Sequence, residues 1–442
     1  MSFIIVTLCA SGGSAQTVPP PVDREWTFEA VLKSALAQHP LVEAAQARVA
    51  AAQGGRVTAG TFPNPVGTVW VENTAFPGQR QVPGVTRETS TYFTLPLEPL
   101  FQRKARVRSA DETVKAAGAD LAGERRQVAL AAAHAFYRVA VAQVSLDAAE
   151  EHRVALEALV SYNRNRVSTG ATAEIELLRV EVELERATTN VALARIDATR
   201  SWTELRPFLE TAPPAYPMGS TPPVMARVRV SDAPATAPSL SFPDLLARAR
   251  EQRPEILAAR ARAAAAAAET AYQRTLVIRH LGATLGFKQA DGDSTLIAAI
   301  SVPLPVFDRN QGEIQRTANE AIAVQKELSW AERQVEAELQ GAYEAAQQLG
   351  AQAGAGQRTT VDRAAEAHRI TLAAYQEGAS SLLQVLDAAR TLVETRQTYL
   401  RTLLAQQQSA FDLALAAGMD PLLSISGSQP VSGPISSGGA SR

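Results

Sequence analysis

The sequence predicts a mainly α-helical protein with a small β part, built from two tandem structural repeats. The first observation is an internal echo, because TFEAVLKSALAQHPLVEAAQARVAAAQ from Thr27 returns as SFPDLLARAREQRPEILAARARAAAAA from Ser241. The second is a seven-residue apolar period over two long stretches, and the third is a pair of alternating β-like runs in each half. Such a duplication favours a pseudo-symmetric object over an enzyme built around one unique site.

Composition narrows the class of protein further. The 442 residues include 43 basic and 45 acidic side chains, for a formal net charge of −2. This balance argues against a nucleic-acid binder, which would show a concentrated basic face. Alanine is abundant, which favours helix and close helix packing. The single cysteine, Cys9, excludes an intramolecular disulfide and any cysteine-based metal or redox motif.

The N-terminus is predicted to direct export. Apolar residues at 3–8 are followed by small ones, so residues 1–15 are interpreted as a signal peptide, although no Lys or Arg precedes the apolar run and the true start codon stays open. Lipid attachment at Cys9 is the alternative, but Leu8 is large for that position. No later apolar run approaches the roughly 20 residues of a spanning helix, so any membrane entry has to use strands.

The first repeat is assigned to residues 16–210. Thr27 is the predicted N-cap of its first helix, and Pro40 is expected to break or restart that helix. Alternating runs at 66–71 and 90–95 then predict a β-hairpin.

A very long helix follows, from about 102 to 168, which is about 100 Å at 1.5 Å per residue. Its seven-residue row predicts coiled-coil-like packing in a tube or rod. The row consists of Val107, Val114, Leu121, Val128, Ala135, Ala142, Ala149 and Leu156.

The second repeat is assigned to residues 241–419 and keeps the same order. Alternating runs at 283–287 and 296–302 predict a second hairpin, which the polar turn ADGDS joins. Its long-helix row consists of Ile314, Ala321, Leu328, Val335, Ala342 and Leu349. Residues 211–240 are Pro-rich and predicted to be a linker, and residues 420–442 form a Ser/Gly-rich tail predicted to be disordered.

Proline pairs are predicted to mark each passage from strand to long helix: Pro96 and Pro99, then Pro303 and Pro305. Proline cannot donate into a ladder but can end a strand. Asp308 is the expected N-cap of the second long helix. Four basic residues follow the first corner, and we interpret them as a solvated face rather than a binding site: Arg103, Lys104, Arg106 and Arg108.

Four strands per chain cannot close a barrel. An open sheet edge in lipid leaves unpaired N–H and C=O groups, each costing several kcal/mol. Outer-membrane barrels begin at about eight strands. If these strands lie in a membrane, the chain therefore has to oligomerise.

A resemblance to a known family rests on the doubled helix starts, the corner SVPLPVFDRNQGEI and the turns STGATAEIELLRV and YQEGASSLLQVLDA. In these features the sequence resembles the outer membrane efflux protein (TolC-like) family. The likeness covers roughly 27–419, apart from the linker, and is greater to the heavy-metal or cation branch than to the drug branch. It implies a homotrimer in the outer membrane, with a twelve-stranded transmembrane β-barrel and an α-helical tube across the periplasm. The implied partners are a periplasmic adaptor (membrane fusion) protein, an inner-membrane RND-type pump and outer-membrane lipid.

The resemblance also implies a role for the two glycine turns. A glycine there ends one helix and lets the chain reverse. In the family these turns are periplasmic tips that meet the adaptor, and both interpretations can hold together. The tip residues are Gly170, Ala171, Thr172, Gly378, Ala379 and Ser380.

A candidate periplasmic gate follows the second turn. Drug-efflux relatives carry two aspartates that line a constriction there, where this sequence has Gln384 and Asp387. Three copies of Asp387 would make an acidic ring that attracts cations. Alternatively, Asp387 is an exposed carboxylate paired with Arg390. The counterpart in the first repeat is Arg179, which could instead form a closing ion pair.

No histidine has a second one three or four positions away, and no catalytic motif is present, so we expect no metal site, no cofactor and no enzyme activity. The alternative function is a periplasmic adaptor or a soluble coiled-coil scaffold. An adaptor has one helical hairpin, whereas this chain has two helical units. The exported substrate, metal cation or organic compound, and the resting state, open or closed, stay undecided.

Overall fold

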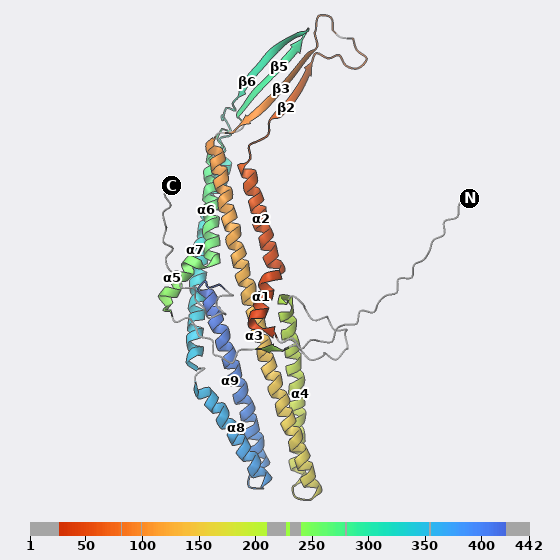
Figure 1. The fold of residues 1–442 in the computed structure, drawn as a ribbon, viewed down its shortest axis with the longest axis vertical. Helices are drawn as coiled ribbons and strands as arrows, with labels where there is room; N and C mark the ends of the chain where they lie inside the picture. Colours follow the sequence, from red (N-terminus) through yellow and green to blue (C-terminus); the bar gives the residue numbers. More distant parts are fainter. Residues whose placement is uncertain are drawn as a thin grey trace, which may run out of the picture.

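The computed structural model describes residues 26–80, 82–98, 100–209, 227–229, 240–278, 281–352 and 355–420. The signal peptide with Cys9, Pro99, most of the linker and nearly all of the tail lie outside the described residues. The molecule is long and narrow, with a sheet at one end and paired helices running to the other (Figure 1).

The first half folds in the predicted order. Thr27 caps the first helix as expected, because its Oγ1 accepts the Ala30 N–H at 3.2 Å. The His39 ring accepts the Leu41 N–H at 3.3 Å and starts the second helix. The elements are α1 (Phe28–Gln38), α2 (Pro40–Gly60), β2 (Val66–Glu72), β3 (Glu88–Leu97), α3 (Leu100–Ser168), α4 (Glu174–Leu205) and the 3-10 turn η1 (Arg206–Phe208).

The second half repeats this order, but its long helix is divided in two. Its elements are α5 (Phe242–Gln252), α6 (Pro254–Thr275), β5 (Leu281–Ala290), β6 (Asp293–Ser301), α7 (Gln311–Gln352), α8 (Ala355–Gln376) and α9 (Leu382–Ala416). The predicted N-cap at Asp308 is wrong. Its Oδ1 accepts the Asn310 N–H at 2.8 Å, and Asn310 takes a positive φ of 61°, so the helix starts only at Gln311.

Both predicted hairpins form, and they join into one antiparallel sheet of order β2-β3-β5-β6. Pairing of Phe93 with Leu285 joins the two repeats through β3 and β5. Within the described residues, the outer strands β2 and β6 are each paired on one side only. One face of the sheet exposes large apolar side chains: Val69, Val71, Phe93, Leu95, Leu285, Phe287, Leu296 and Ile300. The other carries Trp70, Tyr92, Lys288 and the hydrogen-bonded pair Thr94 and Thr284.

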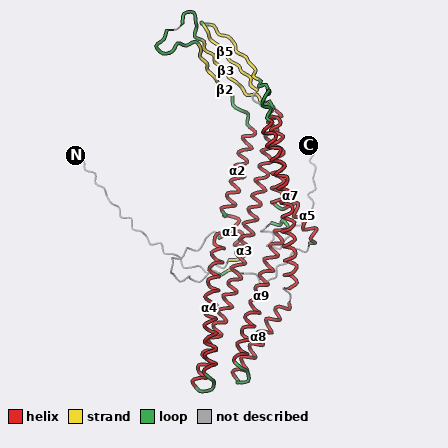
Figure 2. The backbone as a smooth tube through the Cα atoms, turned by 180° about the vertical axis from the view of Figure 1, so that it is seen from behind, coloured by secondary structure: helices red, strands yellow, loops and turns green. Residues whose placement is uncertain are grey.

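The helices pack side by side along α3, which contacts α2, α4, α6 and α9. The predicted seven-residue rows all lie on buried or half-buried faces. About halfway along α3, a hydrophobic core forms around Phe136, which is fully buried, with residues of α1 and α9 packed against it. This region, the core around Phe136, is called the waist below. There β1 (Trp26–Thr27) pairs in parallel with β4 (Val228–Arg229). Figure 2 shows that α3–α4 and α8–α9 end in two turns at the end of the molecule opposite the sheet.

One stretch within Gln102–Ser168 of α3 is long and apolar enough, by length and composition, to cross a membrane. This qualifies the expectation that no such helix follows the N-terminus. Just over half of the stretch, 56%, is buried within this chain. Because Val128, Ala132, Phe136 and Val139 from this helix form the waist core, we assign it as a core helix.

Candidate functional site

Each glycine turn closes in the same way. Gly170 and Gly378 take positive φ angles of 72° and 81°, a region that side chains disfavour. The residue after each glycine donates its N–H to a carbonyl five positions back, at 2.8 Å in both turns. This is the Schellman arrangement, which satisfies the last carbonyls of a helix. Both turns are therefore hydrogen-bonded, solvent-exposed ends of paired helices.

The next polar residue of each turn bonds into the following helix. Thr172 Oγ1 donates to Glu176 Oε2 at 2.7 Å, and Ser380 Oγ donates to Gln384 Oε1 at 2.7 Å. Gln384 Oε1 also accepts the Ser381 N–H at 3.0 Å and completes a capping box. The amide oxygen of the candidate gate residue Gln384 is thus engaged in the turn.

A buried polar contact that the sequence did not reveal ties the two tips together. Tyr375 Oη donates to Asn163 Oδ1 at 2.5 Å, and Asn163 is fully buried. The Arg166 guanidinium lies 5.5 Å from the Tyr375 ring centroid and 5.7 Å from that of Tyr162. Burial, together with the nearby Glu176 carboxylate, raises the pKa of Tyr375. The only sequence signal was an asparagine among the apolar positions of a helix.

Asp387 lies exposed on the second turn of α9 and makes no ion pair with any described residue. Arg390, its suggested partner, instead lies 3.6 Å from Glu183 on α4. Arg179 is likewise exposed, near the start of α4. The alternative pairing of Asp387 with Arg390 is therefore not formed.

The groove between α3, α4 and α9 has a volume of about 820 Å³ and carries mixed charges. Arg138, Arg390 and Arg401 face it together with Glu183 and Glu204. Burial lowers the pKa of His152, which lines the same groove. Among the described residues, no group of three or more His, Cys, Asp or Glu side chains could hold a metal ion.

The basic cluster after the first corner is only half solvated. Arg103 Nη2 donates to the Gly60 carbonyl at 2.6 Å, and Arg106 Nε donates to that of Ala59 at 3.0 Å. These two side chains therefore satisfy carbonyl groups at the C-terminal end of α2. The interpretation of all four basic residues as a solvated face did not include this contact. Lys104 and Arg108 are exposed as expected.

Three of the four predicted corner prolines are among the described residues, and they lie near the passage from strand to helix. Pro96 is in β3, opposite Gly282 and one residue before the strand ends at Leu97. Pro303 and Pro305 lie between β6 and α7.

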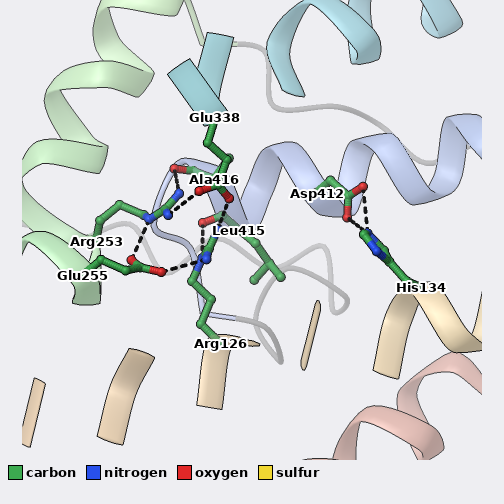
Figure 3. Close-up of polar contacts among 8 residues, drawn as sticks. All are labelled: Arg126, His134, Arg253, Glu255, Glu338, Asp412, Leu415 and Ala416. Atoms are coloured by element: carbon green, nitrogen blue, oxygen red, sulfur yellow. Dashed lines mark hydrogen bonds and ion pairs between the residues drawn. The ribbon is translucent and has the colours of Figure 1, made fainter. Parts of the chain in front are cut away.

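A charge cluster of two buried arginines and two part-exposed glutamates holds the end of α9 next to the Phe136 core (Figure 3). Arg126 donates to Glu255 at 2.8 Å and to the Leu415 carbonyl at 3.2 Å, and it also pairs with Glu338. Arg253, which is 1% exposed, donates to Glu255 at 2.9 Å, to Glu338 at 2.7 Å and to the Ala416 carbonyl at 3.0 Å. Although burial opposes it, hydrogen bonding to Arg253 and the charge of Arg126 hold the pKa of Glu338 below its usual value.

His134 and Asp412 form a second link near this cluster, with Nε2 3.0 Å from Oδ1 (Figure 3). Hydrogen bonding to Asp412 raises the pKa of His134.

The stabilisation from the charged pair of His134 and Asp412 should therefore be complete below the unfolded pKa of about 6.5 and be lost as pH rises through the folded pKa. We expect His134→Gln to lower the melting temperature near pH 6 and to have no effect well above pH 8. Because the pair is half exposed, the effect should stay below about 1 kcal/mol. A wild-type advantage that grows with pH would contradict this.

A sheet with one apolar and one more polar face, carried on paired helices of this length, is the architecture of a membrane channel subunit with a long helical extension. The chain belongs to the outer membrane efflux protein family, whose model matches residues 31–209 and 245–419. It is therefore an outer-membrane efflux channel with a periplasmic helical extension, in a family of channels rather than enzymes. This membership sets aside the periplasmic adaptor and the soluble scaffold.

Curated relatives and solved channels agree with this assignment. The cobalt-zinc-cadmium resistance protein CzcC of Cupriavidus metallidurans is 28% identical over 394 residues, which cover 87% of this chain and 88% of CzcC. The pyoverdine export outer membrane protein OpmQ of Pseudomonas putida is 32% identical over 188 residues, 40% of this chain and 38% of OpmQ. The outer-membrane channel OprN has the same fold, with a TM-score of 0.71 at 17% identity, over 89% of this chain and 90% of OprN. CusC aligns with a TM-score of 0.66 at 21% identity, over 89% of this chain and 92% of CusC.

Proposed function

We propose that three copies of this chain close one barrel and form the passive exit duct of a tripartite efflux system. The observation that carries the proposal is the open four-stranded sheet, whose outer strands β2 and β6 lack a partner on one side among the described residues. Its apolar face suits lipid, and its polar face suits an aqueous lumen. Edge groups in lipid have to be paired, so β2 of one copy pairs with β6 of the next.

The cargo we propose is heavy-metal cations. Support comes from CzcC and from the nickel-cobalt-cadmium resistance protein NccC of Alcaligenes xylosoxydans xylosoxydans, which is 25% identical over 74% of this chain and 70% of NccC. The partial likeness to OpmQ favours an organic cargo as the second candidate.

The decisive test of assembly is the protein mass of the detergent-extracted particle, measured by light scattering with the detergent subtracted. A mass near three chains, from outer-membrane extract, is expected. A monomer that stays soluble without detergent would overturn the proposal.

The tips are proposed to contact the periplasmic adaptor, through which the duct reaches an inner-membrane RND-type pump. Gly170→Leu and Gly378→Leu place a side chain at a positive φ and on an exposed turn. We expect at least tenfold less export with trimer yield unchanged, measured as metal tolerance and as heat-stable oligomer in membranes. Gly350→Leu, in a helix with open space around it, is the control. Normal export in both tip variants would remove the tips from the contact.

Asp387 is proposed to line the gate, with Gln384 and Arg179 nearby as secondary members. Three unpaired carboxylates would attract cations and allow them to block the pore. Asp387→Ala should raise the conductance of the purified duct in a planar bilayer, or weaken its block by divalent cations several-fold. Asp362→Ala, an exposed carboxylate of α8, is the control. Unchanged conductance and block would make Asp387 an ordinary surface residue.

A further inference from the structure

On the apolar face of the sheet, the stretch of apolar side chains along β6 is too short to cross a membrane if it ends at the last paired residue of the strand. On β6 it starts at Leu296, because the row above holds Ser294 opposite Gln289. The last ladder pair joins Ser301 to Gly282. The strand therefore offers about six residues between these limits, whereas a tilted transmembrane strand needs about 9–11. The apolar stretch has to continue toward the helices.

The connection between β6 and α7 supplies the missing length. Val302, Leu304 and Val306 continue the alternation of Leu296 and Ile300 beyond the ladder, and they are 50%, 79% and 61% exposed. Adding them brings the apolar run to about 11 residues, which matches a full span. Phe307 follows and is 91% exposed.

The backbone of this connection suits lipid although it lies outside the ladder. An unpaired N–H in lipid is costly, and proline has none. Pro303 and Pro305 therefore remove two donors from the segment. The Val306 N–H donates to the Leu304 carbonyl at 2.8 Å. The prolines thus do more than end the strand: they let the chain leave the ladder while it is still at membrane depth.

The surroundings of the connection carry positive charge that no described acidic side chain pairs with. Gln102 donates to the Ile278 carbonyl at 2.9 Å, and Asn310 donates to that of Gln273 at 2.6 Å, so α3, α6 and α7 meet at this height. Two acidic side chains nearby are engaged, Glu98 by Arg106 at 2.9 Å and Asp308 by the Asn310 N–H. The exposed basic residues near this junction, which make no ion pair with any described residue, are Lys104, Arg108, Arg274 and Arg309. Arg309 Nε donates to the Pro305 carbonyl at 3.2 Å, which holds its guanidinium beside the connection.

We propose that Val302–Phe307 is a lipid-inserted collar in the leaflet that faces the helices, and that the four basic side chains hold phospholipid phosphates at its edge. Long basic side chains can lie along apolar surface while their charge reaches the headgroups. An anionic membrane surface attracts such charges. The inference rests on the proposed function in one respect, namely that the apolar face of the sheet meets lipid.

Nitroxide labels on single cysteines test the depth of the collar in vesicles of phosphatidylethanolamine and phosphatidylglycerol. Phe307→Cys is compared with Leu296→Cys in the sheet and with Gln79→Cys in the exposed loop between β2 and β3, all in a Cys9→Ser background. We expect the labels at 307 and 296 to collide with oxygen, and the label at 79 with a water-soluble nickel chelate. Nickel access at 307 with lipid exposure at 296 would overturn the collar alone. Nickel access at both would overturn the membrane-embedded barrel itself.

Lipid retention tests the headgroup contacts. Lys104→Gln combined with Arg309→Gln should at least halve the phosphatidylglycerol that copurifies per chain, with phosphatidylethanolamine changed less. Arg358→Gln, an exposed arginine of α8 far from the sheet, should leave both lipids unchanged. Equal phosphatidylglycerol retention in the double variant and the wild type would refute the phosphate contacts.

Discussion

Gly286→Ala is expected to abolish folded oligomer in the outer membrane. Gly286 is paired with Tyr92 in the middle of the sheet, and a Cβ there would overlap the Thr91 carbonyl oxygen and the Cα and Cβ of Tyr92. Two of these atoms are backbone, so no side-chain rotation relieves the clash. Overpacking costs about 1–3 kcal/mol even where a core relaxes, and a rigid ladder should cost at least that.

The measurement is the yield of heat-stable oligomer in outer membranes by semi-native electrophoresis, where we expect a loss of more than tenfold. Gly282→Ala is the matched control in the same strand and on the same face. A Cβ at Gly282 would approach only Thr94 Cγ2 at 3.3 Å and Ser301 Cβ at 3.8 Å. Equal yields from both variants would show that the sheet can open at Gly286, contrary to the packing described.

Arg253→Met should destabilise the waist by about 1.5–3 kcal/mol, the usual contribution of hydrogen bonds to charged groups, because Arg253 is buried although Glu255 and Glu338 are 26% and 43% exposed. The change leaves Glu338 and Glu255 with only Arg126, and it leaves the Ala416 carbonyl without its donor. Because the low pKa of Glu338 depends first on Arg253, the loss should be largest at neutral pH, where Glu338 is charged in both states.

Urea unfolding of the purified protein, followed by the waist tryptophans Trp26 and Trp202, measures this loss. Arg250→Met is the control. Arg250 also joins α5 to α7, through Glu336 at 3.1 Å, but both side chains are about half exposed. Such a pair contributes less than about 1 kcal/mol. Similar losses in the two variants would mean that burial adds nothing to the Arg253 cluster.

The sequence predicted the repeat, the two hairpins and α3 because each rests on a local period. The seven-residue row from Val107 to Leu156 and the alternation around Phe93 and Leu285 can be read without knowing any partner. The glycine turns could be predicted because their signal is also local: a glycine such as Gly170 or Gly378 after a long helix is enough to indicate that the helix ends there.

Contacts between distant segments could not be predicted in this way. Arg126 and Arg253 are 127 positions apart, and nothing in their neighbourhoods indicates that both end at the C-terminus of α9. Arg103 and Arg106 read as surface charges because their acceptors are main-chain carbonyls, which every sequence has. Asp308 fits the pattern of an N-cap, but the positive φ of Asn310 places the helix start at Gln311, two residues later than that cap implies.

The continuity of α3 fixes the distance between the sheet and the tips of the duct. A single helix of 69 residues is about 104 Å long at about 1.5 Å per residue. It runs from the sheet to the tips without a break, so the reach of the duct below the membrane is a fixed number and not a flexible tether. Anything that docks at the tips has to span whatever gap is left. Shortening the duct by one heptad, about 10 Å, would require matching deletions on both sides of both turns to keep the tips level.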